Sequence, residues 1–245
     1  MYLKVIKLNA IDSTNSYLKE LSSNSALQDP IVVVAHTQEK GRGQQGASWQ
    51  SETGKSLTFS LFKRFSALSV SSQASLNFAV SLGVFEALEH MEVPDIAIKW
   101  PNDILSHNKK LAGILIENQV QGSKIVSSVI GMGLNVNEHR FRDLPHATSM
   151  KLSAGREFDL DKVLEIVANS IIEQLNSVER VSKETLMNAY ESHLFRKDML
   201  SVFETPQGER KNGKILGVTT GGQLRVVHED DKIREYGMKE IKLLY

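Results

Sequence analysis

The sequence contains no cysteine, and this absence excludes disulfide bonds and thiolate metal sites. A chain without cysteine suits a reducing compartment, so we expect a cytoplasmic protein. No apolar run approaches the ~20 residues that cross a bilayer, and we therefore expect no membrane partner. The N-terminal residues MYLKVIKLNA also lack the apolar core of a signal peptide and predict a first strand instead.

The sequence also lacks an excess of either charge. Lys plus Arg and Asp plus Glu number 29 each, so the formal net charge is zero at pH 7. Non-specific binding to nucleic acid needs a basic surface, because cations must neutralise the phosphates. We therefore expect no DNA partner for the chain as a whole, although a local basic patch stays open.

The hydrophobic pattern predicts an α+β protein with two domains. Apolar residues that alternate or run continuously predict strands, and apolar residues at helical spacing predict helices. The expected strands are 2–8, 31–35, 57–63, 96–100, 111–117 and 124–134, and the expected helices are 12–21, 73–90, 160–175 and 183–193. Residues 138–159 are expected to be irregular. After residue 195 only short runs separated by turns remain, which predicts a small β-barrel, and we therefore divide the chain into domains 1–195 and 196–245.

The stretch 41–49, GRGQQGASW, combines three glycines with one arginine. A common phosphate loop opens into a helix, whereas this stretch leads into a strand. Closely spaced glycines let backbone amides approach an oxyanion, and Arg42 adds a planar fork suited to a carboxylate or a phosphate. The alternative is a surface loop whose arginine points into water.

Three further motifs leave similar alternatives open when each is taken alone. In KWPND (99–103), Asn102 and Asp103 follow a strand end, where Asp103 is either a Mg²⁺ ligand or part of a simple turn. In KKLAGILIE (109–117), a lysine either reaches over a pocket or lies in solvent, and Gly113 lets a ligand approach the strand. In GMGLNVN (131–137), the strand glycines indicate either close approach of a ligand or a bulge.

In this order and spacing, the four motifs closely resemble those of the biotin protein ligases, also called biotin–acetyl-CoA-carboxylase ligases. The resemblance covers nearly the whole chain and includes the residues DSTN (12–15), Gln38 and LPHATS (144–149). Residues 213–227 are similar to the family's small SH3-like C-terminal domain. The resemblance implies an α+β fold with a mixed-sheet catalytic domain of the biotin/lipoyl ligase type, followed by an SH3-like β-barrel.

The resemblance implies that the chain activates biotin with ATP to form biotinyl-5′-AMP and then passes the biotinyl group to one lysine of a biotin carboxyl carrier domain. Mg²⁺ is the implied cofactor, a biotin-dependent carboxylase is the implied partner, and the protein is expected to be a monomer or homodimer. Some relatives carry an N-terminal DNA-binding domain. Because this chain begins with the first strand of the catalytic domain, we expect the monofunctional type.

A lipoyl or octanoyl ligase is the rival interpretation. Such an enzyme would have a longer apolar slot for its substrate and no partners for a ureido ring.

The resemblance also implies where biotin binds. A buried ureido ring needs partners for its carbonyl and both N–H groups, which short polar side chains at the start of the first helix supply. Gly113 and Gly133 are expected to border the apolar slot for the rest of the molecule. The expected biotin-binding residues are Ser13, Thr14, Asn15, Gln38, Arg42, Gly43, Gln44, Lys110, Gly113 and Gly133.

Arg42, Lys110 and Asp103 are the catalytic residues that the resemblance implies. Fixed cations at Arg42 and Lys110 offset the repulsion between the biotin carboxylate and the ATP α-phosphate. Asp103 is the tentative Mg²⁺ ligand and the hypothetical acceptor of the carrier lysine's proton. Trp49 either covers the adenylate or packs as core. The expected ATP-binding and adenylate-binding residues are Trp49, Lys99, Trp100, Asn102 and Asn135.

Many family members have a second arginine at the position of Gln44, reading GRGR where this chain reads GRGQ. Because Gln44 donates hydrogen bonds but adds no charge, we expect either that biotinyl-AMP is held less tightly than in those relatives, or that Lys40, Lys55 or Arg64 compensates for the missing charge. Gln44→Arg should therefore slow dissociation of the intermediate, as measured by its off-rate. An unchanged off-rate would contradict this prediction.

Overall fold

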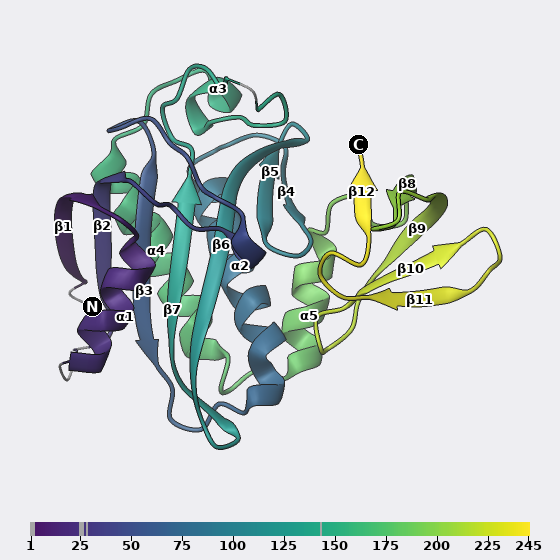
Figure 1. Cartoon of the computed structure of the whole chain (residues 1–245), viewed down its shortest axis with the longest axis horizontal. Helices are drawn as coiled ribbons and strands as arrows, with labels where there is room; N and C mark the ends of the chain where they lie inside the picture. Colours follow the sequence, from purple (N-terminus) through teal and green to yellow (C-terminus); the bar gives the residue numbers. More distant parts are fainter. Residues whose placement is uncertain (1–2, 25–26, 28, 143) are drawn as a thin grey trace.

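The structure is a computed structural model of the chain, and it describes residues 3–24, 27, 29–142 and 144–245. Its larger part is a seven-stranded mixed sheet with helices on both faces, and its smaller part is a five-stranded antiparallel sheet (Figure 1). The mixed sheet confirms the α+β class. Among the described residues, no helix has both the length and the apolarity needed to cross a membrane.

The large sheet has the strand order β1-β2-β3-β7-β6-β5-β4, which places β7 at its centre. Only β1 and β2 pair in parallel among these strands, and the other neighbours are antiparallel. Its strands are β1 (Lys4–Ile11), β2 (Ile31–Gln38), β3 (Leu57–Arg64), β4 (Ile96–Lys99), β5 (Asp103–Ser106), β6 (Lys109–Gln121) and β7 (Lys124–Leu134). The helices are α1 (Thr14–Asn24), α2 (Gln73–His90), α3 (Met150–Ala154), α4 (Leu160–Ser177) and α5 (Lys183–Ser192).

The two faces of the large sheet have separate hydrophobic cores. On β2, Ile31 and Val33 pack with Leu18 of α1, while Val32 between them packs into the larger core with α2 and α4. Side chains alternate between the faces of a strand, so the continuous apolar run in β2 supplies both cores. The prediction that β2 is buried on both faces is therefore confirmed. This arrangement leaves α1 alone on one face, beside the stretch 41–49 (Figure 1).

Most predicted elements are confirmed, and α2 coincides with the predicted helix 73–90. The prediction of irregular structure over 138–159 is wrong at α3, a five-residue helix capped by Ser149 and by Gly155 with a φ of 69°. A helix this short shows no apolar period.

The strand β5 was also missed, because it follows the Pro101–Asn102 turn directly. Asp103 is therefore the first residue of a strand, and it does not lie beyond a strand end as predicted. Tyr2, in the predicted first strand, lies outside the described residues.

The smaller sheet has the order β11-β10-β9-β8-β12 and confirms the expected small β region. Its strands are β8 (Leu200–Glu204), β9 (Arg210–Val218), β10 (Leu224–His228), β11 (Ile233–Tyr236) and β12 (Lys242–Leu244), the last of which was not predicted. Trp100 Nε1 donates to Gly222 O at 2.9 Å, and Val218 N donates to Glu191 Oε1 at 2.7 Å. These bonds tie the sheet to the body of the protein. The division at residue 195 stays a prediction.

Close packing of α2 against α4 depends on Gly83. An added Cβ at Gly83 would lie 2.8 Å from Ile171 Cα, a backbone atom that cannot move alone. Glycine to alanine in an exposed helix stabilises by about 1 kcal/mol, but overpacking a core costs about 1–3 kcal/mol. Gly83→Ala should therefore lower the free energy of unfolding by up to about 2 kcal/mol, which is the overpacking cost less the helix gain, measured by urea denaturation.

The matched control is Gly221→Ala, where the nearest atom to the added Cβ is Thr219 Oγ1 at 3.5 Å. We expect its stability to stay within about 0.5 kcal/mol of the parent. A Gly83→Ala protein as stable as the parent would show that the helices separate freely.

Candidate functional site

The stretch 41–49 forms a closed loop instead of leading into a helix. Trp49 N donates to Gly41 O at 2.9 Å, and Gly43 N donates to Ala47 O at 2.7 Å. A Cβ at Gly41 would lie 2.3 Å from Trp49 O, so only glycine permits this closure. Between these contacts the chain makes a short 3₁₀ turn at Gln44–Gly46. The loop therefore crosses the face of the sheet as a compact unit that carries Arg42 and Trp49.

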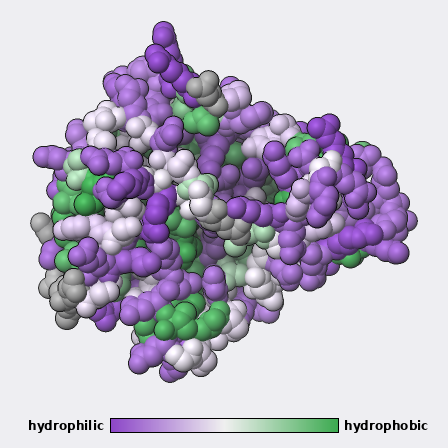
Figure 2. Space-filling model, viewed as in Figure 1, coloured by the Kyte–Doolittle hydropathy of each residue, from purple (hydrophilic) through white to green (hydrophobic). Residues whose placement is uncertain are grey.

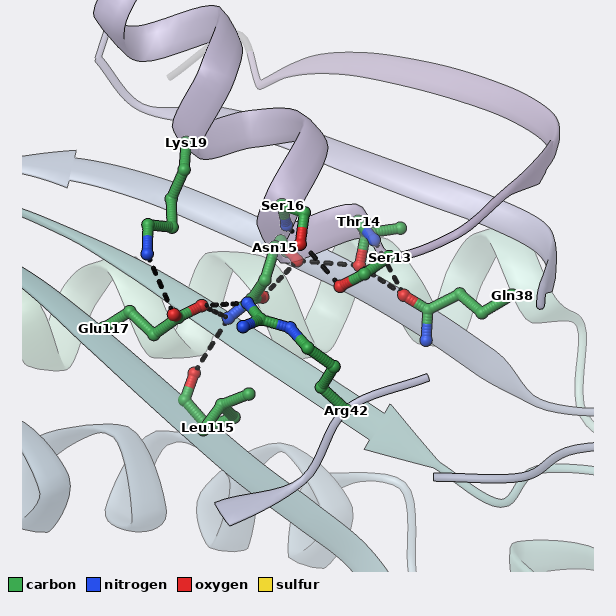
Figure 3. A network of polar contacts seen from close by, with 10 residues as sticks. Ser13, Thr14, Asn15, Ser16, Lys19, Gln38, Arg42, Leu115 and Glu117 are labelled. Carbon is green, nitrogen blue, oxygen red and sulfur yellow. Dashed lines mark hydrogen bonds and ion pairs between the residues drawn. The ribbon is translucent and has the colours of Figure 1, made fainter. Parts of the chain in front are cut away.

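A buried polar cluster lies at the start of α1 (Figure 3). Both the backbone N and Oγ1 of Thr14 donate to Gln38 Oε1, at 2.8 and 2.9 Å. Ser60 Oγ lies 2.7 Å from Thr14 Oγ1 and 2.5 Å from Asn15 Oδ1. Thr14, Asn15 and Ser60 are all at most 3% exposed, which fixes their orientation. Ser60 was not predicted as a site residue, although a serine within the apolar strand β3 indicates a buried polar contact.

The glycines of β7 make room for the protein's own side chains. A Cβ at Gly131 would lie 2.3 Å from Asn15 Oδ1, and one at Gly133 would lie 2.2 Å from Trp49 Cε2. Gly113 lies directly opposite Gly133 and also faces the indole. The pairing of β7 is regular at these positions, so they form no bulge. The Trp49 indole therefore occupies the part of the sheet face where the sequence places a ligand slot.

The indole of Trp49 leaves a polar atom without a partner. Within the described part of the chain, its buried Nε1 has no hydrogen-bond acceptor. The Lys110 Nζ lies over the ring, 5.7 Å from its centroid. Buried donors are nearly always paired with protein, water or ligand, so this N–H is available to an incoming acceptor.

Asp103 lies between two lysines at the junction of β4, β5 and β6. Lys110 Nζ is 2.7 Å from Asp103 Oδ1, as an ion pair whose angles fall outside those of a hydrogen bond. Lys99 Nζ is 3.7 Å from Asp103 Oδ2. Asp103 pairs with Gly113 across the sheet, which brings this charged group beside the glycines. Two ammonium groups share one carboxylate, so this end of the site carries a net positive charge.

Arg42 makes a different ion pair at the other end of the site. Its Nη2 donates to Glu117 Oε2 at 2.7 Å, and Asn15 Nδ2 donates to the same oxygen at 2.8 Å (Figure 3). Lys19 Nζ donates to Glu117 Oε1 at 3.0 Å. Burial of Glu117 opposes its ionisation, but hydrogen bonds from Asn15 and Lys19 and the charges of Arg42 and Lys19 outweigh burial and lower its pKa. Glu117 is the last residue of the motif KKLAGILIE, and no role was predicted for it.

Many of these groups line one cavity of about 190 Å³ between α1, the loop and the sheet. Thirteen of the predicted site residues line it, together with Gly131. They are Ser13, Thr14, Asn15, Gln38, Arg42, Gly43, Gln44, Trp49, Asn102, Asp103, Lys110, Gly113 and Gly133. Ligand pockets commonly measure about 300–1,000 Å³, so the indole leaves this one small.

Three predicted residues lie in neighbouring cavities instead. Lys99 and Asn135 line a cavity of about 460 Å³ that shares Trp49, Asp103 and Lys110 with the first. Trp100 lines a cavity of about 770 Å³ between the two sheets, where the molecule is hollowed in Figure 2.

The side-chain amides of Asn102 and Asn135 have backbone partners. Asn102 Nδ2 donates to Ile114 O at 2.7 Å, and Asn135 Nδ2 donates to Thr148 O at 3.0 Å. Both side chains therefore hold neighbouring segments in place.

A known protein family matches the part of the chain that forms this site. The model of the biotin/lipoate A/B protein ligase family matches residues 8–135, from β1 to the end of β7. The chain belongs to this family. The matched residues include the polar cluster, the glycine loop and both ion pairs of the site.

Curated relatives of this family member support the same assignment. The bifunctional ligase/repressor BirA of Bacillus subtilis is 33% identical over 162 residues, covering 64% of this chain and 49% of the relative. The biotin–[acetyl-CoA-carboxylase] ligase of Mycobacterium tuberculosis is 33% identical over 141 residues, covering 56% and 51%. The match thus spans about half the length of these relatives.

A solved structure of the family resembles the whole chain. The biotin protein ligase of Aquifex aeolicus, in complex with biotin and ATP, has a TM-score of 0.79 at 28% identity and covers 98% of both chains. The likeness therefore extends over both sheets.

The described residues of this family member do not form a ready-made metal site. Among them, no group of three or more His, Asp or Glu side chains is placed to hold a metal ion. Mg²⁺ prefers oxygen ligands and is often held by one or two carboxylates plus substrate phosphates. Asp103 offers one carboxylate, and two lysines already face it. It fits only as a single protein ligand to a metal ion that arrives with a nucleotide.

Gly131 and Gly133 offer a matched pair of substitutions on one strand face. Gly133→Ala should displace the Trp49 indole, because a ring 2.2 Å from the new Cβ cannot remain in place. We expect a red-shifted tryptophan emission. Gly131→Ala should disturb Asn15 and leave the emission unchanged, since its Cβ meets Asn15 Oδ1. Identical emission from the parent and Gly133→Ala would place the indole elsewhere.

Proposed function

We propose that the protein activates biotin with ATP and transfers the biotinyl group to a lysine of a biotin carboxyl carrier domain. Membership of the ligase family supports this proposal, as do relatives named biotin–[acetyl-CoA-carboxylase] ligase and a similar structure in complex with biotin and ATP. By the same names, the partner is a biotin-dependent carboxylase. The absence of a DNA partner and the monomeric or dimeric state stay predictions.

The observation that carries the proposal is the polarity of a single cavity. Thr14, Asn15 and Gln38 line one end, while Lys110 lines the other beside Asp103. Biotin has the same polarity, with a neutral ureido ring at one end and a carboxylate at the other. Buried hydrogen-bonding side chains fix orientation, and a lysine offsets the negative charge.

In the first step, a biotin carboxylate oxygen bonds to the α-phosphorus of ATP, and the bond from that phosphorus to pyrophosphate breaks. Both reactants are anions, so their approach is opposed by repulsion. Lys110, on β6, and Arg42, on the glycine loop, offset this repulsion and the charge that develops on the phosphorus oxygens. Mg²⁺ bound with ATP would supply further positive charge, with Asp103 as its one protein ligand.

In the second step, the ε-amine of the carrier lysine bonds to the biotinyl carbonyl carbon, and the bond to AMP breaks. The amine must lose a proton, and we assign Asp103 as its acceptor. Asp103 lines both the 190 Å³ cavity and the neighbouring 460 Å³ cavity. It therefore lies where the acyl group and the nucleotide would meet.

The 460 Å³ cavity is our candidate for the nucleotide. Trp49, Lys99 and Asn135 line it, together with His146 and Tyr245. Flat aromatic and aliphatic walls suit a nucleobase, and the lysines suit phosphates. Trp49 lines both this cavity and the biotin cavity, so its indole would contact both substrates.

A mass measurement tests the proposed function. The protein is incubated with MgATP, a carrier domain, and either biotin or lipoate. We expect the carrier mass to increase by one biotinyl group with biotin only. A lipoyl adduct would instead indicate a lipoate ligase, the other kind of enzyme in the biotin/lipoate family. No adduct on a carrier that a known biotin ligase modifies would overturn the proposal.

Adjacent lysines provide a matched pair for the activation step. Lys110 lines the cavity and pairs with Asp103, while Lys109 is exposed to solvent. Lys110→Gln should lower the rate of biotinyl-AMP formation by about 10²–10³-fold, the usual effect of losing one group that stabilises transition-state charge. Lys109→Gln should retain the parent rate. Equal rates for both variants would remove Lys110 from the mechanism.

A further inference from the structure

Glu117 is a carboxylate that the proposed mechanism does not use. It lies on β6, two residues beyond Leu115 and four beyond Gly113, and these two residues line the biotin cavity. Alternate residues of a strand share a face, so Glu117 continues the same row. Its side chain is 21% exposed, which makes it a half-buried anion at the edge of the site.

Both oxygens of Glu117 have donors (Figure 3). Oε2 accepts from Asn15 Nδ2 at 2.8 Å and from Arg42 Nη2 at 2.7 Å, while Oε1 accepts from Lys19 Nζ at 3.0 Å. One oxygen thus joins the polar cluster at α1 to the guanidinium on the glycine loop. Arg42 and Glu117 come from distant parts of the chain, so their pairing also holds the loop against the sheet.

Each cation that lines the biotin cavity is paired with a carboxylate of the protein itself. Lys110 pairs with Asp103 and Arg42 pairs with Glu117, both at 2.7 Å. A guanidinium held by one carboxylate in this way is less available to a second anion, because the first pair must be broken or shared. Arg42 is 43% exposed on its side chain, so it is accessible to an exchange of partners.

We infer that Glu117 is a positioning residue that competes with the anionic ligand for Arg42. Without ligand, Glu117 holds Arg42 at the Asn15 end of the cavity. With an anionic ligand, the guanidinium turns to that anion, and Glu117 keeps its bonds to Asn15 and Lys19. This inference rests on the proposed function only in naming the ligand, a biotin carboxylate or the acyl-adenylate formed from it.

Equilibrium binding of biotin and of its neutral amide tests the inference. Glu117→Gln keeps an acceptor for Asn15 but removes the charge that holds Arg42. We expect this variant to bind biotin about two- to fivefold more tightly, the range for a partly exposed ion pair. Binding of biotinamide should stay unchanged, because biotinamide has no carboxylate to pair with the released Arg42 guanidinium. Titration calorimetry measures both constants on the full chain without catalysis.

Two other variants serve as controls. Lys19→Gln removes the competing cation from Glu117 Oε1, strengthens its hold on Arg42, and should weaken biotin binding. Because Lys19 is 52% exposed on its side chain, this variant tests the inference even if Glu117→Gln fails to fold. Glu157→Gln makes the same charge change in the remote ion pair with Lys151, and should leave both constants unchanged.

The outcomes separate the inference from the proposed function. Equal changes for biotin and biotinamide, or none for either, overturn the competition and leave Glu117 as a support for Asn15. Failure of the parent to bind either compound overturns the proposed function and the inference with it. Tighter binding of biotin alone, with the opposite change in Lys19→Gln, supports the competition.

Discussion

The site depends on a missing side chain at two positions of the central strand. Gly131 and Gly133 lie on one face of β7, where any Cβ would collide with Asn15 and Trp49. The hollow they leave lets the polar end of α1 and the glycine loop settle against the same sheet. The cavity, the buried polar cluster and the position of the indole all follow from that space. Residues with side chains at these two positions would hold both elements farther from the sheet.

The second feature of the site is internal neutralisation of its cations. Arg42 and Lys110 each face a carboxylate of the chain, and the Arg42–Glu117 pair joins segments that are distant in sequence. Such pairing lowers the cost of keeping cations in a half-buried site without ligand. It also sets the strength with which an anion is held, because every bound anion competes with an existing partner. The stability of the site and its affinity for an anion are therefore linked.

Local patterns predicted much of this fold and part of the site. The period of α2 and the alternation of β6 and β7 are properties of short segments, so their positions agree with the predicted ranges. Three short elements were missed, namely α3, β5 and β12, because three to five residues give at most a weak period. Ser60 and Glu117 were missed for another reason, since their importance comes from partners more than 40 residues away.

The sequence by itself determined the class of fold, the family and the types of residue at the site, because motifs and apolar periods are properties of order and spacing. Only the tertiary structure decided which groups meet. The loop GRGQQGASW shows the difference, since its glycines and arginine are visible in the sequence while its contacts are not. Arg42 pairs with Glu117 from a strand 75 positions away, and Trp49 lies on two strand glycines. Contacts of this kind depend on how strands are ordered in the sheet, and no local pattern encodes that order.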